Sequence, residues 1–302
     1  MTKNSVTIYL SAIGLLLVIA LGWYAYSFLF PPQSDETSFD GLRAYEDVET
    51  QIAFGPRVPG SSAHIQVREW MRDELEAAGW QVEVQEAEAM GHPIFNLIAK
   101  RSDDPPQIIF GAHYDTRLFA DNDPVLANRN QPPPGANDGA SGVAVLLELA
   151  RSLPKDTVGV WLTFFDAEDN GRIESWDWIL GSTVFVESNS IQPRAVVIVD
   201  MIGDADLNIY KEKNSSPALT DEIWMVAESM GYGAQFLPEY KYTMVDDHLP
   251  FIEAGIPTVE IIDFDYPYWH MLADTPDKIS PLSLEAVGKT LWAWTTRQKA
   301  QN

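Results

Sequence analysis

The sequence has no cysteine among its 302 residues, so disulfides, thiolate metal sites, iron–sulfur clusters and cysteine nucleophiles are all excluded. Basic residues are also scarce: 20 Lys and Arg stand against 44 Asp and Glu, which gives a formal net charge of −24. A surface of this charge repels a phosphate backbone, so we expect no nucleic-acid partner. Histidine is rare as well, and any histidine-containing metal site must draw on only 5 residues.

Charge is missing altogether from one stretch near the start of the chain, between Asn4 and Ser34. Within it, residues 6–30 are almost all apolar, and a run of this length can cross a hydrocarbon core of about 30 Å. A buried core helix would show a polar face. A cleaved signal peptide would end in small residues, whereas this run ends in bulky aromatics such as Trp23 and Tyr24. We therefore predict an uncleaved, single-pass transmembrane helix at 6–30.

The charges that flank this run predict its orientation. Lys3 lies before it, whereas Asp35 and Glu36 follow it. Because the basic side tends to stay in the cytoplasm, residues 1–5 are predicted to form a short cytoplasmic tail. A linker at 31–40 would then lead to a domain at 41–302 on the extracytoplasmic side of the membrane.

The domain at 41–302 alternates helical and strand patterns. Apolar residues at helical spacing alternate with short, continuously apolar runs such as Val196–Val199, which are typical of strands covered by helices on both faces. We predict a single α/β domain with a mostly parallel central sheet flanked by helices. The helices are expected at 39–54, 61–78, 139–153, 183–188, 218–230 and 281–297, and the strands at 81–86, 94–100, 107–112, 158–165, 195–201 and 258–262.

Acidic residues and histidines gather where the predicted strands end. The segments are GAHYDTR (111–117), GANDGASG (135–142), FDAEDNG (165–171), VDMIG (199–203) and YWH (268–270). The carboxyl ends of parallel strands meet at one edge of a sheet, so these segments are expected to converge. The side chains brought together would be His113, Asp138, Glu168, Asp169, Asp200 and His270.

Several carboxylates in one pocket repel one another unless a cation neutralises them. Imidazole and carboxylate ligands without sulfur suit zinc in an open, catalytic site. Asp115, two residues after His113, is expected to accept a hydrogen bond from the free ring nitrogen of that histidine. Taken alone, any one of these acids is more simply interpreted as a turn or helix-cap residue. Asp166 is expected only to orient its loop. His64 and His92 belong to no such segment and are expected to be ordinary packing or surface histidines.

The ordered segments resemble the zinc aminopeptidase superfamily, which includes the glutaminyl-peptide cyclotransferases (glutaminyl cyclases). The resemblance covers residues 44–294. The motifs GAHYDTRLFADNDP, GANDGASGVAVLLELA, FFDAED, DDHLPFIEAGIPTVEII and YWHMLADTPDKIS are more similar to the cyclase branch, and to its bacterial members in particular. A glutaminyl cyclase converts the N-terminal glutamine of a peptide to pyroglutamate and releases ammonia.

The cyclase pattern, carried over residue by residue, implies one zinc ion. Its ligands would be Asp138, Asp169 and His270. Glu168 would be the general acid and base, with Asp200 and Asp246 in an acidic network beside it, and Trp269 would line the substrate pocket. Trp176 or Trp178 is a further candidate for the pocket wall. Asp169 stands where animal cyclases have Glu, so this ligand is one methylene shorter.

The aminopeptidase pattern implies a different reaction at the same residues. His113 and Asp200 would bind a second zinc, bridged to the first by Asp138, and a metal-bound water would attack the first peptide bond. Both extra ligands are present, so one zinc is expected and two remain an alternative. A non-catalytic relative is a third class, but it would have lost ligands, and here none is lost. In both enzymatic interpretations the substrates are the N-termini of peptides or proteins. The membrane is a further expected partner, through the N-terminal anchor.

Overall fold

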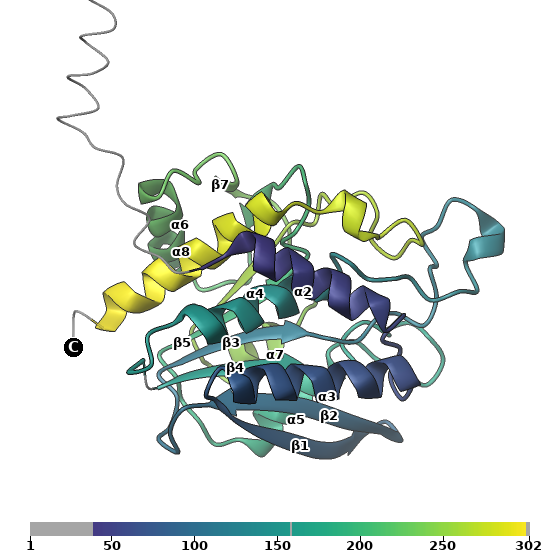
Figure 1. Cartoon of the computed structure of the whole chain (residues 1–302), viewed down its shortest axis with the longest axis horizontal. Coiled ribbons are helices and arrows are strands. Elements are labelled where there is room, and N and C mark those ends of the chain that lie inside the picture. Colours follow the sequence, from purple (N-terminus) through teal and green to yellow (C-terminus); the bar gives the residue numbers. More distant parts are fainter. Residues whose placement is uncertain (1–38, 158, 300–302) are drawn as a thin grey trace, which may run out of the picture. The chain divides into compact units, whose positions relative to one another are not determined.

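The computed structural model of the protein describes residues 39–157 and 159–299 (Figure 1). The predicted transmembrane helix at 6–30 lies outside these residues and stays a prediction. The described part of the chain contains no helix that has both the length and the apolar character of a membrane span. Residues from Phe39 onward form one compact unit, and the predicted α/β domain is confirmed.

The central sheet has six strands in the order β1-β2-β4-β3-β5-β8. β3 (Ile108–His113), β4 (Val160–Phe165), β5 (Ala195–Asp200) and β8 (Thr258–Ile262) are parallel to their neighbours within this group. β1 (Gln81–Ala89) and β2 (His92–Lys100) form an antiparallel hairpin, and β2 pairs antiparallel with β4. The sheet is therefore mostly parallel, as predicted.

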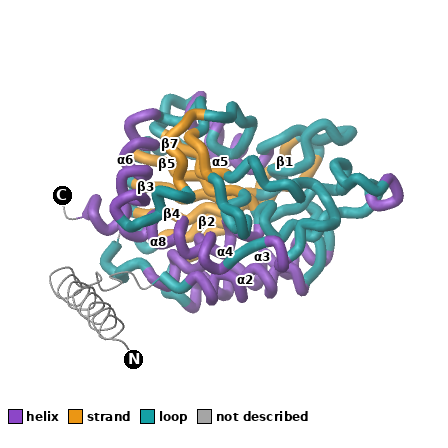
Figure 2. The backbone as a smooth tube through the Cα atoms, turned by 90° about the horizontal axis from the view of Figure 1, so that it is seen from above, coloured by secondary structure: helices purple, strands orange, loops and turns teal. Residues whose placement is uncertain are grey.

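Most helices pack on one face of this sheet. Figure 2 shows α2 (Gly41–Ala53), α3 (Ser62–Ala77), α4 (Ala140–Ser152) and α8 (Pro281–Lys299) gathered along one side of the strands. α6 (Pro217–Ser229) packs against α8 and β8. A hydrophobic core lies on each face of the sheet. The side chains of β5 alternate between these two cores, because successive side chains of a strand point to opposite faces. Val197 and Val199 lie in the core with α4 and α8, whereas Val196 and Ile198 lie with α5 (Leu180–Ser188) and α7 (Leu249–Glu253).

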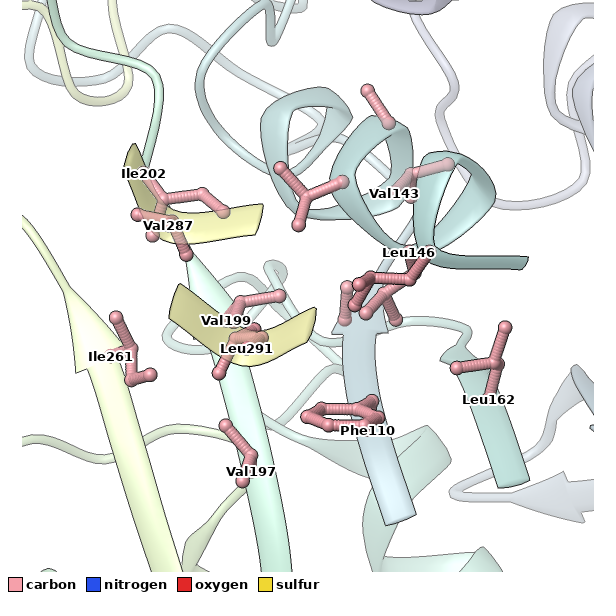
Figure 3. Packing of buried hydrophobic residues seen from close by; sticks show 14 of the residues in the cluster. Phe110, Val143, Leu146, Leu162, Val197, Val199, Ile202, Ile261, Val287 and Leu291 are labelled. Carbon is pink, nitrogen blue, oxygen red and sulfur yellow. The ribbon is translucent and has the colours of Figure 1, made fainter. Parts of the chain in front are cut away.

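The larger core is a continuous layer between the sheet and its helices. Figure 3 shows Val143 and Leu146 of α4 above Phe110 of β3, with Leu291 of α8 beside Val199 of β5. α4 and β5 pack so closely at Gly142 that they leave no room for a side chain there. An added Cβ at Gly142 would lie 2.5 Å from the backbone oxygen of Val199. α4 can therefore approach β5 closely, and this brings the start of α4 to the carboxyl edge of the sheet.

The remaining short elements differ from the predicted pattern. β6 (Ile209–Lys211) and β7 (Phe236–Tyr240) form a separate parallel pair, and η1 (Leu126–Asn128) and η2 (Pro276–Lys278) are single turns in loops. The helix expected at 183–188 begins earlier, at Leu180. None of β6, β7 and α7 was predicted from the sequence, because elements of three to five residues are too short to show a periodic pattern.

Candidate metal centre and active-site pocket

The predicted convergence at the carboxyl edge of the sheet is observed. His113 ends β3, Asp200 ends β5, and Glu168 and Asp169 follow β4 within a few residues. Asp138 lies just before α4. His270 comes from the loop after β8. These residues are almost completely buried, with exposed fractions of 2% to 6%.

The ligand candidates form two clusters that share Asp138. In one cluster, His270 Nε2 lies 2.7 Å from Asp169 Oδ1 and 3.7 Å from Asp138 Oδ2. In the other, His113 Nε2 lies 3.1 Å from Asp138 Oδ1 and 3.2 Å from Asp200 Oδ1. Within each cluster the possible ligand atoms all lie within 4.8 Å of one another, a separation that one metal ion can bridge. The two oxygens of Asp138 thus face different histidines.

The other ring nitrogen of each histidine faces a carboxylate outside the clusters. His113 Nδ1 lies 3.4 Å from Asp115 Oδ1, as predicted. His270 Nδ1 lies 3.5 Å from Asp121 Oδ1, and Arg117 donates two hydrogen bonds to the Asp121 carboxylate. Such partners fix the ring orientation of metal-binding histidines. Asp121 and Arg117 were missed as functional residues, although both lie in the motif that begins at Gly111.

Two buried charged residues hold the Asp138 segment. The Asp274 carboxylate accepts hydrogen bonds from the backbone N–H groups of Asn137 and Asp138. Arg57 donates to the backbone oxygens of Gly135 and Asp138. Neither residue was predicted to have a role, because each lies far along the chain from the segment that it holds.

Asp115 organises the loop after β4. Its carboxylate accepts hydrogen bonds from the backbone N–H groups of Glu168 and Asp169, and from Asn170 Nδ2. The backbone at Ala167, beside Glu168, has φ 54°, a left-handed conformation that is uncommon outside glycine. Met201, after Asp200, and His270 itself are also left-handed, with φ 47° and 57°. Such strained positions persist where the surroundings over-determine them, often at functional sites.

The acidity of the ligand groups reflects burial and crowding. Burial raises the pKa of Asp169 to about 6, and the charge of Asp138 adds to this effect. For Asp138, burial is outweighed by the hydrogen bond and charge of His113, which lower its pKa. For His270, burial is outweighed by the charge of Asp169, which helps to raise its pKa to about 9. The cluster thus depends on cations to offset its carboxylates, whether imidazolium or metal.

The residues present fit a zinc ion. Oδ2 of Asp169 is buried without a hydrogen-bond partner among the described residues, although a buried carboxylate oxygen normally has one. The donor set of imidazole nitrogen and carboxylate oxygen is one that zinc takes at catalytic sites. The Asp138–Asp169–His270 cluster therefore offers a site in which an otherwise unsatisfied oxygen would bind the metal.

A cavity of about 250 Å³ opens beside this cluster. Trp178 and Trp269 form part of its wall, and the Trp178 and His270 rings are stacked with an interplanar angle of 15°. Glu168 and Asp246 also line the cavity. Burial raises the pKa of Glu168 well above its ordinary value, and the charge of Asp246 raises it further.

The acidic network beside Glu168 continues into the protein interior. Burial and the charge of Asp200 raise the pKa of Asp246 to about 7. His248 lies completely buried two residues later, with Nδ1 3.1 Å from Glu260 Oε2 and Nε2 3.4 Å from Glu212 Oε2. No role was predicted for His248, Glu260 and Glu212, although the first two lie within the quoted DDHLPFIEAGIPTVEII motif.

The residues expected to have no catalytic role lie elsewhere. His64 Nε2 is hydrogen-bonded to Asp166, and its ring stacks on Tyr114, so it is a buried packing residue. Asp166 also accepts from the backbone N–H of Phe95, consistent with a purely structural role. Trp176 stacks on His92 and is not part of the cavity wall, which leaves Trp178 as the second tryptophan there.

Comparison with known proteins identifies the family. The model of peptidase family M28 matches residues 96–295. A glutaminyl-peptide cyclotransferase from Boiga irregularis is 25% identical over 289 residues, covering 78% of this chain and 75% of that protein. The crystal structure of Porphyromonas gingivalis glutaminyl cyclase matches with a TM-score of 0.82 and 32% identity, covering 87% of this chain and 99% of that one.

A Zn-dependent exopeptidase from Parabacteroides distasonis also matches, with a TM-score of 0.80 and 30% identity, covering 85% of this chain and 98% of that one. These relatives support an enzyme that uses zinc. The resemblance inferred from the motifs is thereby confirmed, and the chain belongs to peptidase family M28, on the branch that contains the glutaminyl cyclases.

Proposed function

We propose that the protein is a glutaminyl-peptide cyclotransferase that binds one catalytic zinc ion through Asp138, Asp169 and His270. The observation that carries this proposal is the placement of Glu168. Its carboxyl group lines a small cavity walled by tryptophans, directly beside the Asp138–Asp169–His270 cluster. This position would let one side chain exchange protons with a substrate in the cavity.

The reaction is intramolecular. The N-terminal amine of the peptide attacks the side-chain amide carbon of its own glutamine, a new C–N bond closes the ring, and the amide nitrogen leaves as ammonia. No activated water is needed, so the enzyme must mainly fold the substrate and exclude water. Zinc, when bound, supplies a Lewis acid that polarises the amide oxygen.

The residues of this chain supply the proton transfers. Glu168 takes a proton from the attacking amine and delivers it to the departing nitrogen. Its raised pKa suits a group that must accept and donate near neutral pH. Asp246 lies beside it in the cavity wall and contributes to that pKa. Trp178 and Trp269 give the cavity an apolar wall that favours the compact substrate conformation and limits water.

A zinc aminopeptidase is the second candidate, and a specific observation favours it. His113 and Asp200 form a second cluster with Asp138, and all three side chains are buried. Two zinc ions there would hold a water and the substrate carbonyl together, with Glu168 as the general base.

One experiment separates the two candidates. Purified full-length protein, loaded with zinc, is incubated with a Gln-initiated peptide amide and with an aminoacyl anilide. Cyclisation releases ammonia and lowers the peptide mass accordingly, whereas aminopeptidase activity releases free aniline. Release of aniline with uncyclised peptide would replace the cyclase by the aminopeptidase.

A further inference from the structure

The cavity contains a charge that the proposed chemistry does not use. Among the described residues that line it, Arg172 is the only cation, and the other charged lining residues are all acids. These acids are Asp138, Glu168, Asp169, Asp200 and Asp246. Zinc and the proton-transfer network account for the acids, but neither accounts for Arg172.

Among the described residues, the guanidinium of Arg172 also has no protein partner. In the part of the chain that the structure describes, it makes no ion pair or hydrogen bond, and its side chain is exposed. Arg117 differs sharply, because it is buried and pairs with Asp121. An exposed, unpaired arginine at a cavity wall can meet a ligand without first breaking a contact within the protein.

The backbone nevertheless holds Arg172 at this place. An added Cβ at Gly171 would lie about 2.1 Å from the ring of Trp178, so the chain passes directly over a tryptophan of the cavity wall. The backbone oxygen of Gly171 accepts a hydrogen bond from Arg117. Arg172 itself has φ 63°, in the left-handed region. The arginine therefore extends from a backbone that is fixed relative to the cavity.

The reaction determines what part of the substrate can reach it. The N-terminal glutamine must occupy the interior of the cavity, beside Glu168, and the rest of the peptide must leave through the solvent side. Because Arg172 is exposed, the substrate atoms next to it belong to the residue that follows the glutamine. Arginine binds carboxylates by paired, charge-assisted hydrogen bonds.

We propose that Arg172 binds a carboxylate adjacent to the N-terminal glutamine, so that the preferred substrates carry an acidic second residue or are Gln dipeptides with a free C-terminus. This inference rests on the proposed cyclase function. Both carboxylates present the same chemistry to the guanidinium, and synthetic substrates can tell them apart.

The test compares four substrates with the zinc-loaded, full-length protein. Gln-Gln-amide and Gln-Glu-amide differ only by a side-chain charge, and Gln-Ala-amide and Gln-Ala differ only by a terminal one. We expect kcat/KM to be about five-fold higher for the charged member of at least one pair, and the difference to lie mainly in KM. A five-fold effect is the scale of one partly exposed ion pair. The preference should weaken in about 0.5 M salt, because salt screens such a pair.

Variants locate the effect. Arg172→Gln should abolish the preference, Arg172→Lys should retain part of it, and Arg172→Glu should invert it. Arg72→Gln, on the exposed surface of α3, removes the same charge away from the cavity and should change nothing.

The outcomes distinguish this inference from the proposed function. Equal cyclisation of all four substrates, or a preference that survives Arg172→Gln, would overturn the role of Arg172 and leave the cyclase function standing. If none of the four is cyclised, the proposed function fails and the inference fails with it.

Discussion

At the scale of single residues, Glu168 combines an enclosed position with access to the substrate cavity. Its backbone is fixed by Asp115, while its side chain accepts no hydrogen bond from the described residues. Asp169, the next residue, is directed to His270 instead. Two adjacent carboxyl groups thus face different targets, one the candidate metal and the other the substrate.

Glu168→Gln is expected to keep the fold and the zinc but to lower kcat for cyclisation by about 10²-fold or more, the scale of lost general acid–base catalysis. Only the carboxylate form of Glu168 can accept the proton of the attacking amine. Because the pKa of Glu168 is raised, this form becomes populated only at a pH above the usual carboxyl range. The kcat of the wild-type protein should therefore increase with pH above the usual carboxyl range. The kcat of the Glu168→Gln variant should not show this increase. Glu174→Gln, an exposed change in the same loop, is the control. A variant with near-normal kcat would remove Glu168 from the mechanism.

Asp121 is the second residue whose role can be measured directly. Its carboxylate lies against the ring nitrogen of His270 that does not face Asp169. Asp121→Asn should weaken zinc binding by about 10-fold, because partners of this kind orient the ligand and raise its basicity. Competition with a chelator of known affinity measures the change, with the exposed Asp177→Asn as the control. Unchanged affinity would show that the Asp121–His270 contact contributes nothing to the metal site.

At the scale of secondary-structure elements, a buried charge cluster joins three of them. His248 precedes α7, Glu260 lies in β8, and Glu212 follows β6, and all three side chains are completely buried. Burial would lower the pKa of His248, but contacts with Glu212 and Glu260 outweigh it and raise this pKa to about 10. Burial would raise the pKa of Glu212, but the hydrogen bond with His248 helps to lower it to about 2.

The sign of the resulting pH dependence follows from these values. A histidine whose pKa rises from 6.5 to about 10 on folding stabilises the protein fully below pH 6.5, and this contribution is lost as pH rises through 10. His248→Ala leaves two buried carboxylates without their cation, a change that costs about 3 kcal/mol or more. The loss of unfolding free energy should therefore be large at pH 6 and small at pH 10.

Urea unfolding at the two pH values measures this difference, and His92→Ala provides a matched histidine outside the cluster. A loss of stability that is equal at both pH values would mean that His248 acts by packing alone. Glu212 also accepts a hydrogen bond from the backbone N–H of Met244, two residues before Asp246, so stability and catalysis are expected to be linked at this position.

At the scale of the whole molecule, the metal centre joins segments from across the domain. Removal of zinc should destabilise the protein, because a ligand that binds only the folded state adds about 2.7 kcal/mol at 100 times its dissociation constant. Thermal unfolding with and without chelator, followed by zinc restoration, measures the effect.

Elemental analysis should find one tightly bound zinc per chain, lost in His270→Ala and kept in His92→Ala. Two tight zinc ions per chain would favour the aminopeptidase candidate.

The membrane anchor is a second proposal at this scale. We propose that residues 6–30, which lie outside the described residues, cross the membrane and place the catalytic domain on the extracytoplasmic side. Protease added to intact cells should then digest the domain, while a cytoplasmic marker stays protected. The double variant Leu16→Arg and Val18→Arg should release the protein from membranes, since each central arginine costs about 2.5 kcal/mol or more. Protection until lysis would reverse the orientation, and wild-type protein found only in the soluble fraction would exclude the anchor.

Much of this architecture was predictable from local patterns. Continuously apolar runs identified the buried strands, and helical spacing identified α2, α3, α4, α6 and α8 to within a few residues. A buried parallel sheet demands such runs, and its carboxyl edge collects the residues that follow them. The approximate location of His113, Glu168, Asp169 and Asp200 was therefore evident from the sequence alone.

Only the tertiary structure could decide how these side chains divide their contacts. The two oxygens of Asp138 face different histidines, Trp178 lines the cavity while Trp176 does not, and Arg57 and Asp274 hold a segment distant in sequence. The cluster around His248 also joins residues that no periodic pattern relates. Periodicity reports which face of an element is buried, whereas the direction of a loop side chain depends on packing between distant segments. For this reason the sequence determined the sheet and the edge at which the site lies, and the three-dimensional structure decided which groups meet there.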